Sequence, residues 1–270
     1  MAHFVIIGAG QAGSSLVAKL RSSGFEGEIT LIGEEHVPPY QRPPLSKAYL
    51  LGDIALERLF LRPESFYADQ NITLQMGAAV TSIDMAKREV HLGDAVISYD
   101  QLALTTGSRA NTLPASIGGA LDGVFTVRTL ADVDAMADHF NAGKRALIVG
   151  GGYIGLEAAA VARKMGVEVT VVEMAERILQ RVAAPDTSDY FRALHQSHGV
   201  KILEGVGLKS LNGEGYVCGA TLANGTELDV DFVIVGVGIT PNASLAEKAG
   251  LTIENGIAVN EQGCTSDPNI

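Results

Sequence analysis

Two glycine-rich turns are the residues of this sequence best suited to bind a ligand. Both have the spacing G-x-G-x-x-G, and their glycines are Gly8, Gly10, Gly13, Gly150, Gly152 and Gly155. In such a turn the first glycine allows a tight bend, the second lets the backbone approach a phosphate, and the third permits close helix packing. The helix that follows presents unpaired N–H groups to an anion. The chemistry expected at each turn is therefore the binding of a dinucleotide pyrophosphate.

An acidic residue follows each turn at a distance suited to a ribose. Glu34 and Glu173 stand 21 and 18 residues beyond the last glycine of their turns, and each ends an apolar run. The expected spacing is about 20 residues, and a carboxylate there accepts hydrogen bonds from ribose hydroxyls. Because the strand end at 172–174 offers no arginine, the second turn predicts NAD(H) rather than NADP(H). Arg177 and Arg181 lie further along and leave that preference open.

The elements around these turns occur twice. Residues 3–35 and 145–176 each read as an apolar strand, the glycine turn, a helix and a second apolar strand. The likeness continues in the segments 100–107 and 231–238, each an acidic residue, an apolar strand and a glycine, and an asparagine, Asn111 or Asn242, stands four residues beyond that glycine. Unbroken apolar runs of this kind suit buried parallel strands. The sequence therefore predicts an α/β protein built from two copies of one module.

Composition limits what such a protein can do. The chain has 270 residues, enough for two domains, and its 31 glycines exceed the usual share of about 7%. With 31 acidic and 20 basic residues the net charge is -11, which argues against a nucleic-acid partner. No apolar run approaches the 18 residues that a membrane span needs, and no basic leader precedes the first strand. We expect a cytoplasmic protein with no membrane partner.

Four motifs resemble those of a known family. They are Pro-Pro-Leu-Ser-Lys at 43–47, Thr-Thr-Gly at 105–107, Gly-Gly-Gly-Tyr-Ile-Gly-Leu-Glu at 150–157 and Thr-Ser-Asp-Pro at 265–268. The chain resembles the bacterial NADH-dependent ferredoxin reductases of oxygenase systems, which are flavoproteins of the pyridine nucleotide-disulphide oxidoreductase superfamily. The resemblance implies two Rossmann-like domains in the glutathione-reductase-like arrangement, with FAD on the first and NAD on the second. It also implies electron transfer from NADH to a [2Fe–2S] ferredoxin that serves a cytochrome P450 or a ring-hydroxylating dioxygenase.

The repeat and the resemblance together set the domain limits. The FAD-binding domain is expected at residues 1–112 plus 244–270, and the NAD-binding domain at 113–243. The family has a further C-terminal interface domain, which we expect to be absent from these 270 residues. The chain is also expected to stop a few residues before the flavin site is complete, and neither sequence nor resemblance indicates an oligomeric state.

The resemblance assigns roles to individual residues. At FAD it implies contacts to the pyrophosphate, the ribose and the adenine, a Thr-Thr-Gly turn, and positive charges near the flavin. The residues concerned are Gly8, Gly10, Ala12, Gly13, Glu34, Val80, Thr106, Gly107, Arg42, Lys47 and Arg128. At NADH it implies contacts from Gly150, Gly152, Tyr153, Ile154, Gly155, Glu173 and Gly238. Two residues are candidate catalytic residues, Lys47 beside the flavin and Glu157 beside the nicotinamide.

The mechanistic hypothesis joins these two residues. If Lys47 lies near the flavin and pairs with Glu157, its charge would stabilise the reduced, anionic flavin. A structural interpretation of Glu157 stays open, because an acid in the first turn of a helix gains about 0.3–1 kcal/mol from the helix dipole alone. Tyr153 could shield the flavin until the nicotinamide enters, or simply pack.

Other functions are weighed against this one. A flavoprotein that binds NADH mainly for regulation, as in the apoptosis-inducing-factor group, is an alternative, and so is an NADH-fed component of rubredoxin or nitrite reduction. The two cysteines, Cys218 and Cys264, lie 46 residues apart, and no cysteine precedes Cys218, which disfavours disulphide or peroxide reduction through a redox cysteine. His195 and His198 have no third ligand at suitable spacing, so no metal site is expected.

Overall fold

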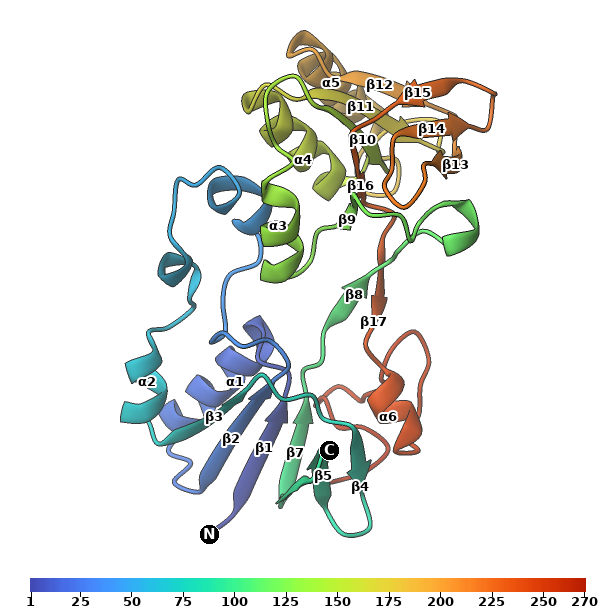
Figure 1. Cartoon of the computed structure of the whole chain (residues 1–270). Helices are drawn as coiled ribbons and strands as arrows, with labels where there is room; N and C mark the ends of the chain where they lie inside the picture. The colour runs from blue at the N-terminus through green and yellow to red at the C-terminus, as the bar shows by residue number, and fades with distance from the viewer. The chain divides into compact units, whose positions relative to one another are not determined.

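A computed structural model describes all residues, 1–270, and separates into two compact units (Figure 1). The first unit comprises Met1–Gln41, Leu56–Arg109 and Thr240–Ile270, and the second comprises Arg42–Ala55 and Ala110–Ile239. None of the helices is both long and apolar enough to cross a membrane.

The first unit is built on a parallel sheet of four strands in the order β3-β2-β1-β7. Its strands are β1 (His3–Ile7), β2 (Glu28–Gly33), β3 (Ile72–Met76) and β7 (Gln101–Leu104). The helices are α1 (Gln11–Ser22), α2 (Glu64–Asp69) and α6 (Ser244–Lys248), with the short helix η2 (Leu56–Leu59). A second, antiparallel sheet holds β4 (Ser82–Asp84), β5 (Glu89–Leu92) and β6 (Ala95–Ser98).

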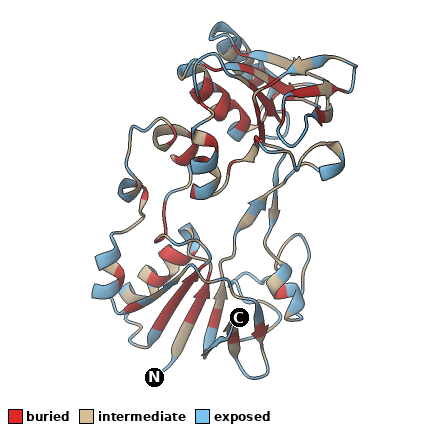
Figure 2. Cartoon of the chain, in the orientation of Figure 1, coloured by how far each residue is buried: buried red, intermediate tan, exposed pale blue.

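Both faces of this parallel sheet are covered, which explains its unbroken apolar strands. Ile6 on β1 packs with Val17 of α1, whereas Val5 and Ile7 pack on the other side with Val90 of β5. All five are under 7% exposed, and Figure 2 shows buried stretches along the strands of this sheet. Successive residues of a strand point to opposite faces, so a strand that is buried on both must be apolar throughout.

The second unit repeats this plan with one additional strand. Its parallel sheet has the order β12-β11-β10-β16-β9. The strands are β9 (Val124–Thr126), β10 (Arg145–Val149), β11 (Glu168–Glu173), β12 (Lys201–Glu204) and β16 (Phe232–Val235). The helices are α3 (Leu130–Ala137), α4 (Tyr153–Lys164) and α5 (Pro185–Ser197), with the short helices η1 (Leu45–Tyr49) and η3 (Ala115–Ile117). An antiparallel sheet holds β13 (Leu208–Asn212), β14 (Gly219–Leu222) and β15 (Glu227–Asp229).

The two units match strand for strand. The order β3-β2-β1-β7 corresponds to β12-β11-β10-β16, and a three-stranded antiparallel sheet precedes the last strand in each. In the second unit that sheet packs on the faces of β10 and β16, where Leu147, Val149 and Val233 meet Ala220 and Leu222. The predicted α/β class and the internal repeat are confirmed.

Two short strands, β8 (Ser108–Ala110) and β17 (Ile239–Pro241), pair where the chain passes between the units. Each is followed or flanked by the asparagine that recurs in the sequence repeat. The backbone N–H of Asn111 donates to the carbonyl of Gly238 at 3.0 Å, and that of Asn242 donates to the carbonyl of Gly107 at 2.9 Å. Each copy of the repeat thus bonds the strand-end glycine of the other.

Candidate functional site

The first glycine turn connects β1 to α1, and its three glycines meet different surroundings. Gly8 has φ +113°, and a Cβ on it would lie 2.2 Å from the carbonyl oxygen of Thr105, just beyond β7. A Cβ on Gly13 would lie 2.2 Å from the carbonyl oxygen of Gly8. Gly10, the N-cap of α1, has negative φ, and a Cβ there would meet nothing within 4 Å. Folding requires the first and third glycines, and only the second faces open space.

The second turn, between β10 and α4, repeats this geometry. Gly150 has φ +109°, and its added Cβ would lie 2.4 Å from the carbonyl oxygen of Gly236. A Cβ added to Gly155 would lie 2.1 Å from the carbonyl oxygen of Gly150, whereas a Cβ added to Gly152 would again meet nothing within 4 Å. No side chain caps α1 or α4, so their first N–H groups face outward for a ligand. Both turns fit a pyrophosphate.

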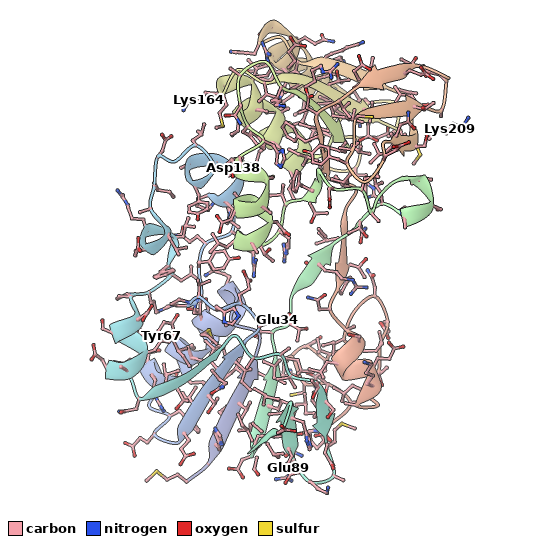
Figure 3. The ribbon with its side chains drawn as sticks, in the orientation of Figure 1. Glu34, Tyr67, Glu89, Asp138, Lys164 and Lys209 are labelled. Atoms are coloured by element: carbon pink, nitrogen blue, oxygen red, sulfur yellow. The ribbon has the colours of Figure 1, made fainter.

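The two ribose-site carboxylates differ in their surroundings. Glu34, labelled in Figure 3, is exposed just beyond β2. Glu173, the last residue of β11, accepts hydrogen bonds from the backbone N–H of Gly151 at 2.7 Å and of Ala175 at 2.8 Å. A carboxylate offers about four lone-pair positions. Glu173 therefore holds the glycine turn in place and still has acceptor capacity for ribose hydroxyls.

Lys47 and Glu157, the two candidate catalytic residues, form an ion pair. Lys47 Nζ lies 2.9 Å from Glu157 Oε1, with side chains 44% and 37% exposed. Lys47 sits at a kink within η1, and Glu157 is on α4. Because α4 begins at Tyr153, Glu157 lies beyond the first turn, so the expected placement in that turn is wrong. The helix dipole therefore gives little reason for an acid here.

The segment that carries Lys47, Arg42–Ala55, is fastened to helices of the second unit at several points. Arg42 Nη1 donates to the carbonyl of Arg128 at 2.8 Å, and the Tyr49 hydroxyl donates to Asp134 Oδ1 on α3 at 2.8 Å. Sequence reasoning missed Tyr49 and Asp134, because a tyrosine and an aspartate 85 residues apart carry no motif. The two hydrogen bonds hold Lys47 within reach of α4.

Asp53 forms the last of these links, since Lys164 Nζ lies 3.8 Å from Asp53 Oδ2. Their side chains are 65% and 58% exposed, so this contact is weak. Leu45 and Leu50 bury the segment's apolar side instead, at 1% and 6% exposed.

The remaining predicted site residues of the first unit lie around its strand ends. Thr106 Oγ1 donates to the carbonyl of Asn242 at 2.7 Å, and Asn242 Nδ2 returns a bond to the carbonyl of Thr106 at 2.9 Å. Gly107 has φ +65° in the same turn. Val80 is half-buried against the core beside β5, and Ala12 is exposed at the start of α1.

In the second unit, two predicted residues directly follow the open glycine, Gly152, and a third lies beyond β16. Tyr153 and Ile154, the first residues of α4, are 58% and 38% exposed. Gly238 has φ +104° beyond β16. Apolar side chains left exposed beside a phosphate turn are available to a ligand, and Tyr153 does not pack into the core of its unit. Of the two interpretations of Tyr153, simple packing is the weaker.

Of the two arginines that left the nucleotide preference open, Arg181 is exposed and Arg177 is bonded within its own unit. Its Nη1 donates to Ser188 Oγ at 2.6 Å and its Nη2 to the carbonyl of Gln180 at 3.4 Å. Ser188 is fully buried. An arginine engaged in this way is not free to bind a 2′-phosphate.

Metal and thiol chemistry find little support in these side chains. No group of three or more His, Cys, Asp or Glu residues is arranged to hold a metal ion. Burial, and to a smaller extent the charge of His198, lowers the pKa of His195, which favours its neutral form. Cys218 and Cys264 are free and exposed.

The fold and these turns define a protein of two Rossmann-type modules, each with a glycine-rich turn at the carboxyl end of its parallel sheet. The chain belongs to the pyridine nucleotide-disulphide oxidoreductase family, whose model matches residues 2–270. The four motifs found in the sequence therefore identified the family correctly.

Known relatives are similar along almost the entire chain. Rhodocoxin reductase of Rhodococcus erythropolis is 44% identical over 268 residues, which cover 98% of this chain and 62% of the relative. Putidaredoxin reductase of Pseudomonas putida is 42% identical over 274 residues, which cover 99% and 65%. The structure of a covalent putidaredoxin reductase–putidaredoxin complex matches with a TM-score of 0.95 at 41% identity, over 99% of this chain and 66% of that one. The chain thus spans somewhat less than two thirds of these relatives.

Proposed function

We propose that this protein is an FAD-dependent oxidoreductase that takes electrons from NADH and passes them to a [2Fe–2S] ferredoxin of a cytochrome P450 or dioxygenase system. The observation that carries the proposal is the duplicated glycine turn, one in each unit, with only the second glycine facing open space. A chain with two such turns can hold two dinucleotides, as hydride transfer between a nicotinamide and a flavin requires. The FAD-binding module would be residues 1–112 plus 244–270, and the NAD-binding module 113–243.

The residues of the first turn are suited to FAD. Gly10 offers backbone N–H groups to the pyrophosphate, and Glu34 is exposed to accept a ribose hydroxyl. When bound, FAD supplies the chemistry that converts a two-electron hydride into single electrons. What the protein adds is position, charge and exclusion of water.

Lys47 and Glu157 are the residues to which we assign a direct role in the reaction. The lysine brings a positive charge, and the carboxylate 2.9 Å away orients it. A fixed positive charge next to a cofactor that gains electrons favours the reduced form. Arg42 and Arg128, joined through a backbone hydrogen bond, would add positive charge to the same site.

The second turn is suited to NADH rather than NADPH. Glu173 is held on the turn by Gly151 and Ala175, so its negative charge is fixed where a 2′-phosphate would lie. Arg177, which could have offset that charge, is bonded to Ser188. Tyr153 and Ile154 would flank the nicotinamide half of the cofactor.

The acceptor is proposed from the relatives and from the electron count. Each NADH releases two electrons and one proton, so two one-electron ferredoxins are reduced per turnover. The names of three relatives include a redox partner. They are rhodocoxin reductase, putidaredoxin reductase and, at 38% identity, the ferredoxin reductase subunit of a benzene 1,2-dioxygenase system. Two rubredoxin reductases at 37% and 38% identity make rubredoxin the second candidate acceptor. A cytoplasmic location stays a prediction from the sequence.

The test is an absorbance spectrum of the purified protein, followed by anaerobic addition of NADH or NADPH and then of ferredoxin or rubredoxin. We expect flavin absorption that NADH bleaches faster than NADPH, and faster electron delivery to ferredoxin than to rubredoxin. A colourless protein that binds no added FAD, or a flavin that neither nucleotide bleaches, would contradict the proposal. Preferential reduction of rubredoxin would select the second acceptor.

A further inference from the structure

The loop that follows Glu173 in the second unit lies against its glycine turn. Ile178 is fully buried, and a Cβ added to Gly151 would lie 2.6 Å from Ile178 Cγ2. The backbone N–H of Leu179 donates to the carbonyl of Gly151 at 2.9 Å. The turn therefore rests directly on residues 178 and 179, and any shift of these residues moves the turn.

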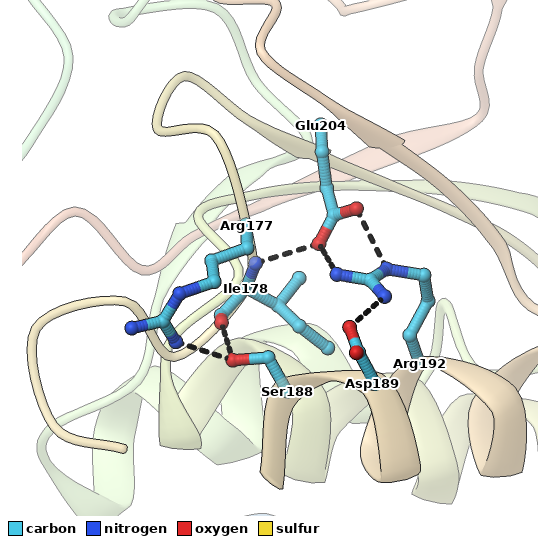
Figure 4. A network of polar contacts seen from close by, with 6 residues as sticks. All are labelled: Arg177, Ile178, Ser188, Asp189, Arg192 and Glu204. Carbon is cyan, nitrogen blue, oxygen red and sulfur yellow. Dashed lines mark hydrogen bonds and ion pairs between the residues drawn. The ribbon is translucent and has the colours of Figure 1, made fainter. Parts of the chain in front are cut away.

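A network of polar side chains bonds to the backbone of Ile178 (Figure 4). Glu204 Oε1, at the end of β12, accepts the backbone N–H of Ile178 at 2.7 Å. Ser188 Oγ, fully buried on α5, donates to the carbonyl of Ile178 at 2.6 Å. Both backbone polar groups of this one residue are thus fixed by side chains from neighbouring elements.

Glu204 is itself held by an arginine on α5. Arg192 binds both of its carboxylate oxygens, with Nε to Oε2 at 2.7 Å and Nη2 to Oε1 at 3.0 Å. Arg192 Nη1 also donates to Asp189 Oδ1 at 2.6 Å. The side chains of Glu204 and Arg192 are 18% and 25% exposed, so this bidentate pair is better shielded from water than a surface ion pair.

The corresponding turn of the first unit has different surroundings. In that turn Ala9 follows the first glycine, and a Cβ added to Gly33 would lie 2.6 Å from the Cβ of Ala9. The neighbouring strand end fills that space, whereas in the second unit Gly151 leaves room for the Ile178 side chain. The two turns therefore differ in what lies against the residue after the first glycine.

We propose that Glu204, held by Arg192, is a positioning residue for dinucleotide binding at the second glycine turn. It acts through Ile178 and Gly151 and does not touch the ligand. The inference rests on the proposed function, because it presupposes that this turn binds the pyrophosphate of NADH. It adds a determinant of affinity that lies outside the turn and its acidic partner.

Glu204→Gln gives a sharp test, because both carboxylate oxygens accept hydrogen bonds from N–H groups. Whichever way the amide turns, its NH2 group meets a donor, either Arg192 Nε or the N–H of Ile178. The matched control is Asp231→Asn, which alters an ion pair with Arg145 at the opposite end of β10, away from the turn. Calorimetric titration with ADP-ribose measures binding without flavin or turnover, and thermal unfolding measures stability.

We expect Glu204→Gln to weaken ADP-ribose binding about five- to twentyfold, and Asp231→Asn to lower the melting temperature while leaving binding within twofold of the wild type. Arg192→Lys keeps a charge but cannot reach both oxygens and Asp189, so it should weaken binding by less; it also serves if Glu204→Gln does not fold. Wild-type affinity in both Glu204→Gln and Arg192→Lys would overturn this inference alone. A wild-type protein that binds neither ADP-ribose nor NADH would overturn the proposed function as well.

Discussion

Replacing the first and second glycines of one turn separates what folding needs from what the ligand needs. In Gly150→Ala the new Cβ would lie 2.4 Å from the Gly236 carbonyl oxygen at φ +109°. Left-handed strain costs roughly 1–2 kcal/mol and overpacking about 1–3 kcal/mol, so the loss of stability is about 2–5 kcal/mol. For a unit of this size that lowers the melting temperature by roughly 4–20 °C.

Gly152→Ala should do the reverse. Its new Cβ meets no atom within 4 Å and its φ is negative, so stability should change by less than about 1 kcal/mol. The methyl group would instead occupy the space where a phosphate approaches. Losing one charge-assisted hydrogen bond costs about 1.5–3 kcal/mol, or roughly a 10- to 150-fold weaker affinity. Thermal unfolding and calorimetric titration with ADP-ribose measure the two effects, and undiminished binding by Gly152→Ala would refute pyrophosphate binding at this turn.

Three further predictions follow from the described contacts. Lys47→Met should change stability by less than about 1 kcal/mol, because the pair with Glu157 is more than one-third exposed. It should nevertheless slow anaerobic flavin reduction by NADH at least about tenfold, whereas the control Asp53→Asn should leave that rate unchanged. A wild-type rate in Lys47→Met would remove Lys47 from the mechanism. Because burial lowers the pKa of His195, its neutral form stabilises the fold above the unfolded-state value near 6.5, and this contribution is lost as pH falls below it. Chemical denaturation of His195→Gln should therefore show a smaller loss of stability between about pH 7.5 and 5.5 than the wild type, and identical curves would count against this. Burial opposes ionisation of Asp231, but hydrogen bonds and charge from Arg145 outweigh this effect and hold the pKa of Asp231 low. Asp231→Asn should therefore be less stable than the wild type above about pH 4, and the difference should vanish in stronger acid.

The repeat was readable from the sequence because each copy contains its own complete signal. Strand, turn, helix and acid lie within about 35 consecutive residues, and parallel strands that are buried on both faces must be apolar at every position. The paired asparagines were also visible as equivalent positions. Their bonding was not, because Asn111 bonds the glycine of the other copy, and spacing within one copy carries no information about partners in the other.

The supports of the site could not be predicted for a related reason. Tyr49 and Asp134, or Glu204 and Ile178, are brought together by packing, and their residue types occur on any protein surface. Lys47 was identified only through its resemblance motif. Its ion pair with Glu157 was a condition of the hypothesis, and the structure meets that condition at 2.9 Å.

Lys47 belongs to the second unit by its contacts. The sequence places residues 42–55 between the second and third strands of the first module, yet they cluster with the second unit, where Leu45 is buried and Lys47 pairs with α4. A charge assigned to flavin chemistry is thus oriented by a helix that begins at the second glycine turn, since Gly152 is the N-cap of the helix that carries Glu157. The second glycine turn and the ion pair of Lys47 thus both involve α4.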